Sequence, residues 1–329
     1  MIVVARCPYR ISLLGGSSDL DWFVNSNKRG LSIGFSIEYF SRVVLTYRDK
    51  SYLRGILNYS SREEYTNLDG ISHPIIRTTL KKLSIQKPLE LSSFGDSIGG
   101  SGLGSSSAFT AALIKGISKL NNKEISNSKV AHIASEIEIN DLGNPIGRQD
   151  QYLCSLGGIN FLEFKHPSKV TQLSKPELIK PIENFVDNLY IVNTKITRSA
   201  NENLRILKDE KTSFSSIKKI LELADRFIAD SEGLSTLEIE NLLNSYMLKA
   251  WNIKKNMVGI LNEELINIEK KLEENGFNVL KLLGAGGGGY FLVRYTGKEL
   301  NNATFSLKKQ NLELENIIIS KEGCVSWKC

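Results

Sequence analysis

A chain of 329 residues with 41% hydrophobic content can bury a large core, so the sequence excludes an intrinsically disordered protein and suits two domains or one large one. Lysine and arginine (42) outnumber aspartate and glutamate (36) by six, and because the excess forms no arginine–lysine run, it favours anionic small molecules over a nucleic-acid partner. The scattered cysteines and histidines lack the spacing of a zinc site, and neither a leader-like start nor an apolar run of about 18 residues occurs. We therefore expect a reduced, cytoplasmic protein with no membrane partner.

The first part of the chain predicts a sheet covered by helices. Alternating β-rich runs, separated by Gly, Ser and Asn, occupy residues 2–5, 11–14, 31–37 and 41–47. Apolar residues then recur at helical spacing over 105–120 and again over 130–139, and a further strand is predicted at 159–164.

The second part of the chain predicts strands around a helical middle. The polar stretch 165–180, which holds two prolines, predicts a domain boundary. Beyond it we expect a strand at 189–192, helices over roughly 200–275, and a strand, a glycine turn and a strand over 279–295. This order predicts an α+β fold.

A first motif lies at residues 8–20, which read Pro-Tyr-Arg-Ile-Ser-Leu-Leu-Gly-Gly-Ser-Ser-Asp-Leu. The pattern predicts a strand that ends in a glycine turn carrying Asp19. A carboxylate on such a turn is well placed to bind the hydroxyl groups of a polyol, although turn aspartates more often cap their own backbone.

A glycine-serine loop at residues 99–108 opens directly into the helix predicted over 105–120. Its glycines allow backbone N–H groups to approach an anion, and the unpaired N–H groups of the helix start add a favourable dipole, so a polyphosphate fits. The serine hydroxyls could bind Mg²⁺ or a phosphate oxygen, or they could merely cap the helix. The loop is no P-loop because no lysine precedes the hydroxyl residue, and the H-R-D and D-F-G motifs of protein kinases are missing.

A carboxylate-rich segment at residues 136–152 predicts a helix, a glycine-proline turn and then Asp150. Phosphoryl transfer needs positioning, a metal, cationic charge and a group that orients the nucleophile. A positioned general base contributes on the order of 10²–10⁴-fold. Asp150 is our candidate for that base, and Arg10 could steady it or the transferring charge; a surface arginine is the alternative for Arg10.

A third glycine-rich motif occupies residues 281–293. It satisfies G-x-G-x-x-G from Gly284 to Gly289, but a strand follows where a dinucleotide-binding motif requires a helix. So many glycines are costly in chain entropy, which favours a need for close backbone approach over a flexible hairpin turn.

Taken together, the three motifs resemble those of the GHMP superfamily, the galactokinases, homoserine kinases, mevalonate kinases and phosphomevalonate kinases. Residues 102–106, Gly-Leu-Gly-Ser-Ser, match the phosphate loop of that superfamily fully. The resemblance implies an α+β, two-domain GHMP kinase fold. It implies an N-terminal domain at 1–172 that is ribosomal protein S5 domain 2-like, and a C-terminal, ferredoxin-like α/β domain at 173–329.

The resemblance also implies roles for individual residues, with ATP and Mg²⁺ as cofactors. Asp150 and Arg10 are the expected catalytic residues, and Ser106 and Glu138, with Glu136 as the fallback, are the expected metal ligands. The residues expected to bind the nucleotide phosphates are Gly100, Ser101, Gly102, Leu103, Gly104, Ser105, Ser106 and Ser107. The residues expected to bind the acceptor are Arg10, Gly15, Gly16, Ser17, Ser18, Asp19, Arg148, Gln149, Arg198, Gly286 and Gly287.

Shorter segments throughout the chain resemble the heptose 7-phosphate kinases within that superfamily; they lie at 138–143, 149–152, 157–161, 196–200 and 322–327. This resemblance implies transfer to the anomeric hydroxyl of D-glycero-D-manno-heptose 7-phosphate, in a monomer or homodimer. Because such a substrate already carries a dianion, we expect a cationic clamp, with Arg148 and Arg198 as candidates and Lys195 behind them.

Three alternatives stay open. A kinase of a neutral sugar, such as L-fucose or galactose, would lack the phosphate clamp. A diphosphomevalonate decarboxylase-like lyase would consume ATP but release carbon dioxide. A non-catalytic sugar sensor would keep binding without chemistry, although the joint presence of Asp150, Glu138 and Ser106 argues against it.

Overall fold

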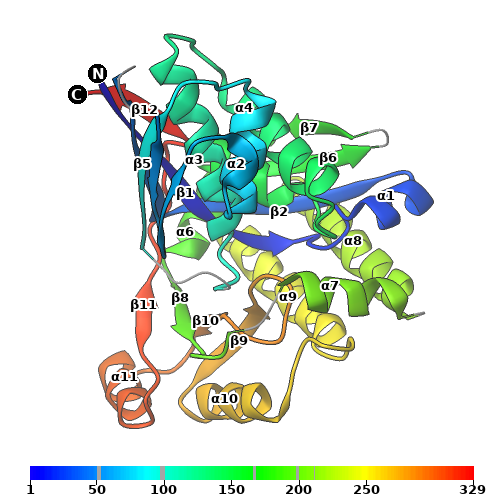
Figure 1. Ribbon diagram of the computed structural model, residues 1–329. Helices are drawn as coiled ribbons and strands as arrows, with labels where there is room; N and C mark the ends of the chain where they lie inside the picture. The colour runs from blue at the N-terminus through cyan, green and yellow to red at the C-terminus, as the bar shows by residue number, and fades with distance from the viewer. Residues whose placement is uncertain (50–52, 97–100, 166–167, 198–199, 211) are drawn as a thin grey trace.

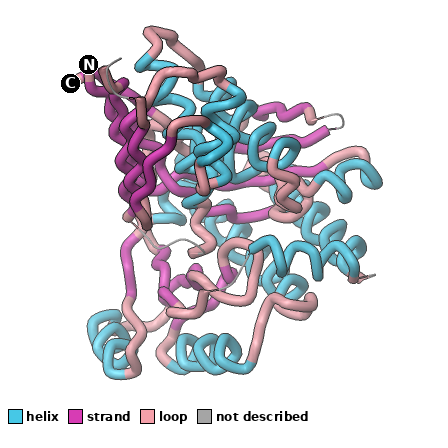
Figure 2. Tube along the Cα trace, in the orientation of Figure 1, coloured by secondary structure: helices cyan, strands magenta, loops and turns pink. Residues whose placement is uncertain are grey.

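The structure is a computed structural model that describes residues 1–49, 53–96, 101–165, 168–197, 200–210 and 212–329. Its described residues form two sheets with helices packed around them, which confirms the predicted α+β class (Figures 1 and 2). Within these residues no helix is both long and apolar enough to cross a membrane.

The first sheet is built on a long antiparallel hairpin of β1 (Ile2–Leu14) and β2 (Gly30–Tyr47). Its other described strands are β3 (Gly55–Asn58), β4 (Arg62–Tyr65), β5 (Leu89–Gly95), β6 (Ile159–Lys165), β7 (Lys169–Leu173) and β12 (Val325–Lys328). The described strands follow the order β12-β1-β2-β5-β3-β4, and β6 pairs with the first half of β2 while β5 pairs with its second half.

The four short runs predicted near the N-terminus are thus two continuous strands. The pairing register between β1 and β2 shifts beside Pro8, opposite Phe40, and again between Ser12 and Leu14. A register shift tolerates a proline that cannot donate to the ladder, so the chain continues as a strand where the sequence pattern predicted an interruption.

The second sheet contains β8 (Leu189–Asn193), β9 (Phe277–Leu282), β10 (Tyr290–Tyr295) and β11 (Leu314–Asn316), in the order β11-β8-β10-β9 among the described residues. All of its pairs are antiparallel. It lies below the first sheet in Figure 1, with α10 and α11 at the far end. The predicted strands at 189–192 and on both sides of the glycine turn are confirmed.

The helices of the described residues cover both sheets. They are α1 (Asp21–Asn27), α2 (Pro74–Lys82), α3 (Ser105–Leu120), α4 (Asn127–Ser135), α5 (Gln149–Leu156), α6 (Pro176–Val186), α7 (Ala200–Asp209), α8 (Ser213–Asp230), α9 (Thr236–Lys254), α10 (Glu263–Glu274) and α11 (Leu300–Lys309). A short 3₁₀ helix lies at Leu68–Gly70. Helix α3 packs on β1 and β2, whereas α9 contacts both β1 and β9 and therefore bridges the two sheets.

The helix predicted over 130–139 differs from the structure in its second half. Helix α4 ends at Ser135 and continues as a π-helical turn, Glu136–Asp141, in which the N–H of Leu142 donates to the carbonyl of Ile137. Such wide turns are rare and often lie at functional sites. Periodicity in the sequence does not distinguish them from an α-helix.

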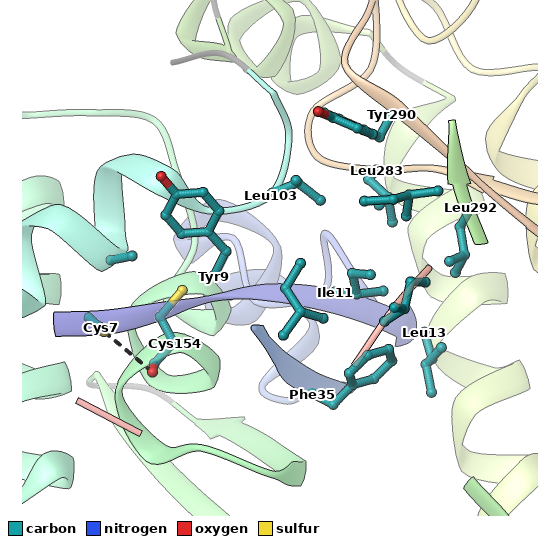
Figure 3. Close-up of a cluster of buried hydrophobic side chains, with 14 of the residues drawn as sticks. Cys7, Tyr9, Ile11, Leu13, Phe35, Leu103, Cys154, Leu283, Tyr290 and Leu292 are labelled. Carbon is teal, nitrogen blue, oxygen red and sulfur yellow. Dashed lines mark hydrogen bonds between the residues drawn. The ribbon is translucent and has the colours of Figure 1, made fainter. Parts of the chain in front are cut away.

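A buried cluster joins the two sheets at the level of both glycine loops (Figure 3). Ile11 and Leu13 of β1 gather with Leu103 of the first loop, and with Leu283 and Leu292 on either side of the second. Each buried side chain of this size contributes about 1.5–3 kcal/mol through the hydrophobic effect, so the cluster holds the two loops against one strand.

The proposed division at residues 172/173 falls at the end of β7, before the chain enters the second sheet. The last strand, β12, returns to pair with β1, and Ile319 forms a bridge to Ile37. A division by sheets would therefore assign the last strand to the first domain.

Candidate active site

A cavity of about 380 Å³ lies where the two sheets meet. Its walls come from segments far apart in the sequence: the end of β1 with the turn after it, the loop before α3, the turn before α5, the end of α9, and the turn after β9. All three sequence motifs and the Asp150 segment therefore contribute to one cavity.

The first wall is the start of α3. Gly104, Ser105, Ser106 and Ser107 line the cavity, and no side chain caps this helix start among the described residues. The first backbone N–H groups of a helix have no partner within the helix and carry the positive end of its dipole. This wall is suited to bind an anion such as a polyphosphate.

The loop before α3 is held from two sides. The carbonyl of Leu103 accepts a hydrogen bond from the Arg10 N–H at 2.9 Å. On the other side, Gly102 and Gly284 lie backbone against backbone, since a Cβ on Gly284 would come within 2.7 Å of the Gly102 Cα. Both glycines have a φ of +77°, so the two glycine loops can meet only because neither residue has a side chain.

Not every residue of the predicted phosphate loop lines the cavity. The Leu103 side chain is buried in the core cluster, and Ser101 is buried behind the loop, with its hydroxyl near the Leu103 N–H. Gly100 lies outside the described residues.

Glu138 is buried beside the start of α3. Its carboxylate, 0% exposed, accepts hydrogen bonds from the hydroxyls of Ser106 (3.0 Å), Ser107 (2.8 Å) and Thr110 (2.9 Å), and from the Gln151 amide. Burial raises the pKa of Glu138, and the hydrogen bond from Gln151 and those from the hydroxyls oppose that rise.

A magnesium ion would find hard oxygen ligands at Glu138 and Ser106, which are in direct contact. No group of three or more His, Cys, Asp and Glu side chains able to hold a metal occurs within the described residues. One or two protein ligands, completed by phosphate oxygens and water, is the usual arrangement for Mg²⁺ in enzymes that transfer phosphate. Glu136, the fallback, is only half-buried and bonds to Asn140.

Asp150, in the first turn of α5, faces the cavity and is held by Arg10. The Arg10 side chain is 5% exposed, and its Nε and Nη2 donate to the two Asp150 oxygens at 2.7 and 2.5 Å. Its Nη1 donates to the Gly102 carbonyl at 2.6 Å. This bidentate pair fixes the orientation of the carboxylate relative to the phosphate loop.

Asp19, the carboxylate of the first motif, also lines the cavity. It is 1% exposed, its Oδ2 accepts a hydrogen bond from the Gln149 N–H at 2.9 Å, and its Oδ1 has no partner among the described residues. Burial raises the pKa of Asp19 to about 6, the Gln149 N–H opposes that rise, and the charge of Asp150 adds to it. A buried acceptor atom with no partner, in the wall of a cavity, is suited to a hydroxyl group of a ligand.

The remaining residues of the first motif divide between the cavity and the turn. Gly16 and Ser17 line the cavity. Ser18, in contrast, is fully buried, and its hydroxyl bonds to the backbone of Gly15 and Leu31. Gly15 lies so close to β2 that a Cβ would overlap the Leu31 carbonyl. Gly15 and Ser18, which the sequence predicts to contact the acceptor, thus shape the turn and do not line the cavity.

Of the predicted clamp, Arg148 and Lys195 lie away from the main cavity. The Arg148 guanidinium bonds to Asp21 and, at 2.9 Å, to Ser168, and it lines a separate cavity of about 90 Å³. Lys195 is exposed and does not line the main cavity. Arg198 lies outside the described residues.

In the third motif, different residues face the cavity from those predicted. Gly286 and Gly287 pack against Ile260 and do not line the cavity, whereas Gly284 and Ala285 do. Gln149, as predicted, lines the cavity, and its side-chain oxygen accepts a hydrogen bond from Ser32 at 2.9 Å.

Sequence reasoning missed two lysines in the cavity wall, Lys254 at the end of α9 and Lys281 on β9. Lys281 had a usable signal, because a lysine within the apolar run Val279–Leu283 is unusual for a buried strand. Lys254 had none, since its neighbour Lys255 is equally charged and the helix pattern does not say which one turns inward.

The chain is similar in sequence to known proteins. Residues 73–158 match the family described as GHMP kinases N terminal domain. The chain is 28% identical to the D-glycero-alpha-D-manno-heptose 7-phosphate kinase of Campylobacter jejuni subsp. jejuni serotype O:2, over 98% of both proteins. It is 30% identical over 204 residues to the bifunctional fucokinase/GDP-fucose pyrophosphorylase of Arabidopsis thaliana, which is 59% of this chain and 19% of that protein.

Solved structures share the whole fold. The crystal structure of a D-glycero-D-manno-heptose 1-phosphate kinase from Bacteroides thetaiotaomicron matches 99% of both chains with a TM-score of 0.75 at 19% identity. At that identity the match shows the fold alone. Residues 73–158 are thus similar to the N-terminal domain of GHMP kinases, the whole chain shares its fold with a solved heptose 1-phosphate kinase, and the named relatives are sugar kinases, which are phosphotransferases with an alcohol group as acceptor.

Proposed function

We propose that the chain transfers the γ-phosphoryl group of ATP to the anomeric hydroxyl of D-glycero-D-manno-heptose 7-phosphate, which gives the 1,7-bisphosphate. The observation that carries this proposal is the position of Asp150 in one cavity with the start of α3 and with Asp19. The name of the Campylobacter jejuni relative supports the heptose phosphate as the acceptor.

In the proposed reaction, Asp150 accepts the proton of the acceptor hydroxyl as its oxygen forms a bond to the γ-phosphorus. The bond from that phosphorus to the bridging oxygen breaks, and ADP leaves. Arg10 keeps the Asp150 carboxylate oriented through two hydrogen bonds. The N–H groups at the start of α3 bind the nucleotide phosphates, and the unpartnered oxygen of Asp19 binds a sugar hydroxyl.

When Mg²⁺ is bound, it neutralises developing charge on the phosphates. We assign Glu138 and Ser106 to hold it, because both offer oxygen atoms next to the phosphate loop. Glu138 lies among neutral hydroxyl and amide donors, and it forms no ion pair among the described residues, so its buried charge calls for a cation.

A kinase of a neutral sugar is the second candidate, and the similarity to the Arabidopsis thaliana fucokinase protein favours it. The two candidates separate in one assay. The purified protein is incubated with ATP and Mg²⁺ and, separately, with heptose 7-phosphate, mannose, L-fucose, galactose and mevalonate derivatives. ADP is followed together with the ³¹P spectrum of the product.

Turnover of heptose 7-phosphate with a new anomeric phosphate signal supports the proposal. Turnover of L-fucose without turnover of heptose 7-phosphate rejects the proposed substrate and keeps the kinase. Release of carbon dioxide from a diphosphomevalonate substrate rejects both in favour of a lyase.

A further inference from the structure

Lys254 and Lys281 place two ammonium groups in the wall of the main cavity. Lys281 is 8% exposed, and its Nζ donates to the hydroxyl and the carbonyl of Ser12 at 2.7 and 3.0 Å. The Nζ of Lys254 donates to the Gly284 carbonyl at 2.9 Å. Behind both lysines lies a small, largely apolar recess lined by Met247 and Trp251 among others.

Neither lysine is neutralised by the protein. Within the described part of the chain, no carboxylate lies within ion-pair distance of either Nζ. Of the nearby carboxylates, Asp150 is paired with Arg10. Burial lowers the pKa of Lys254 to about 8, and burial together with the charge of Lys254 lowers that of Lys281 well below its ordinary value. Lys281 is buried and Lys254 is half-buried, and neither has a carboxylate partner, so an anion from outside the chain would stabilise their charged forms.

The hydrogen bonds of Lys281 assign it to the acceptor side of the cavity, whereas Lys254 bonds to Gly284, between that side and the phosphate loop. Lys281 bonds to β1, and its Nζ lies 3.3 Å from where a Cβ on Gly16 would stand; the Gln149 oxygen lies 3.6 Å from the same point. Asp19, the proposed ligand of a sugar hydroxyl, is bonded to the Gln149 backbone. None of the hydrogen bonds of either lysine runs to the described residues at the start of α3, where we place the nucleotide phosphates.

We propose that Lys254 and Lys281 bind the phosphate group that the acceptor sugar already carries, so that the enzyme selects sugar phosphates over neutral sugars. This inference rests on the proposed kinase function and adds the residues that confer its selectivity. It also replaces the clamp expected at Arg148, whose guanidinium is bonded to Asp21 and Ser168 in a different cavity. Lysine binds phosphate as a compact point charge, and two lysines match a dianion.

The test uses pairs of acceptors that differ only in the terminal phosphate: heptose and heptose 7-phosphate, mannose and mannose 6-phosphate, galactose and galactose 6-phosphate. Lys254→Met and Lys281→Met keep much of the apolar stem and remove the charge. Lys249→Met is the matched control, because Lys249 lies on the same helix, α9, but is exposed.

We expect each cavity variant to raise KM for the phosphorylated acceptor about 10- to 100-fold, because each variant removes one charge-assisted hydrogen bond to the phosphate. KM for ATP and KM for the unphosphorylated member of the pair should change less than about 3-fold. The control should match the wild type. Circular dichroism and thermal unfolding check the fold, and Lys281→Gln replaces Lys281→Met if the latter fails to fold.

The outcomes separate this inference from the proposed substrate. If heptose 7-phosphate is not turned over, but the wild type prefers mannose 6-phosphate to mannose and the variants lose that preference, the inference stands while the heptose proposal falls. If heptose 7-phosphate is turned over and the variants leave its KM unchanged, or raise KM for ATP equally, the inference is overturned while the proposed function stands.

If no acceptor is turned over, calorimetric titration of the wild type and the variants with heptose 7-phosphate in the absence of ATP decides the matter. Weaker binding by both cavity variants than by the Lys249→Met control supports the inference. Equal binding in all proteins, or none in any of them, overturns it.

Discussion

At the scale of single residues, the cavity contrasts two carboxylates. Asp150 is paired with Arg10, whereas Asp19 is buried with one oxygen unpartnered among the described residues. In the proposed mechanism the first receives a proton and the second binds a hydroxyl. The difference follows from their partners: two hydrogen bonds from the Arg10 guanidinium orient Asp150, whereas a single backbone N–H leaves Asp19 partly unsatisfied.

Replacement of the proposed base tests the first assignment. Asp150→Asn should lower kcat by about 10²–10⁴-fold, because the amide cannot accept the acceptor proton, while KM for ATP changes little. Asp141→Asn serves as the control, since Asp141 is bonded to Lys82 outside the cavity wall. Steady-state kinetics measures both variants, and a kcat for Asp150→Asn within a few-fold of the wild type would remove Asp150 from the mechanism.

The buried charge of Asp19 predicts a conflict between stability and function. The pKa of about 6 lies above the ordinary value of 3.8, so the folded state disfavours the carboxylate, and this penalty builds as the pH rises through that interval. This rise of the Asp19 pKa from 3.8 to about 6 corresponds to about 3 kcal/mol. Asp19→Asn should therefore raise the free energy of unfolding by up to about 3 kcal/mol at pH 7.5, with little gain below pH 4, and should weaken acceptor binding.

Urea unfolding at several pH values measures this effect. The exposed Asp187, changed to Asn, should leave both stability and KM unchanged. An Asp19→Asn protein that is no more stable than the wild type at pH 7.5, or that keeps the acceptor KM of the wild type, would contradict the role given to this carboxylate.

At the scale of elements, the contact between the two glycine loops couples the phosphate-binding wall to the second sheet. Gly102 precedes α3, Gly284 follows β9, and their backbones touch. The π-helical turn after α4 has a comparable effect, because it allows both Ile137 and Glu138 to be buried. Elements from both halves of the chain thus set the geometry at the start of α3, the proposed phosphate site.

Gly284→Ala tests this coupling. Its Cβ would come within 2.7 Å of the Gly102 Cα at a φ of +77°, so the phosphate loop must shift. We expect a KM for ATP at least 10-fold higher and a loss of stability beyond the ~1–2 kcal/mol of a left-handed alanine. Gly233→Ala is matched in φ, at +76°, with nothing within 4 Å of the added Cβ, so it should cost only that strain. Equal KM values for ATP in the two variants would contradict the coupling.

At the scale of the whole molecule, the two ends of the chain meet. β12 pairs with residues 3–6 of β1, and the N–H of Cys329 donates to the carbonyl of Ile2. β1 also supplies Arg10 to the cavity and Ile11 to the core cluster. The last strand therefore covers the edge of the strand on which the site is built.

Deletion of residues 325–329 should expose this edge. The loss of several backbone hydrogen bonds at about 0.5–1.5 kcal/mol each should lower the free energy of unfolding by about 2–4 kcal/mol. This pairing lies at the opposite end of β1 from Arg10. The deletion should therefore lower kcat at 20 °C less than Asp150→Asn lowers it. Calorimetry measures the first effect, and an unchanged melting temperature would show that the pairing contributes nothing.

The sequence by itself determined what depends on local pattern. The helix over 105–120, the strands at 159–164 and 189–192, the helices between 200 and 275 and the strand-turn-strand at the end are all confirmed. Hydrophobic periodicity and glycine placement are properties of neighbouring residues, so one sequence suffices to predict them. The α+β class and the resemblance to GHMP kinases followed from the same local motifs, and the family match and shared fold confirm them.

Only the tertiary structure decided which side chain of each motif faces the cavity. Ser18 bonds to the backbone, whereas its neighbour Asp19 lines the cavity. Arg148 bonds to Asp21, whereas its neighbour Gln149 lines the cavity. Lys254 comes from a helix that carries no motif, and Lys281 is a residue of the third motif to which the sequence pattern gives no role. Several of these choices depend on contacts between distant residues, such as Arg148 with Asp21 and Lys281 with Ser12, and no local periodicity carries that information.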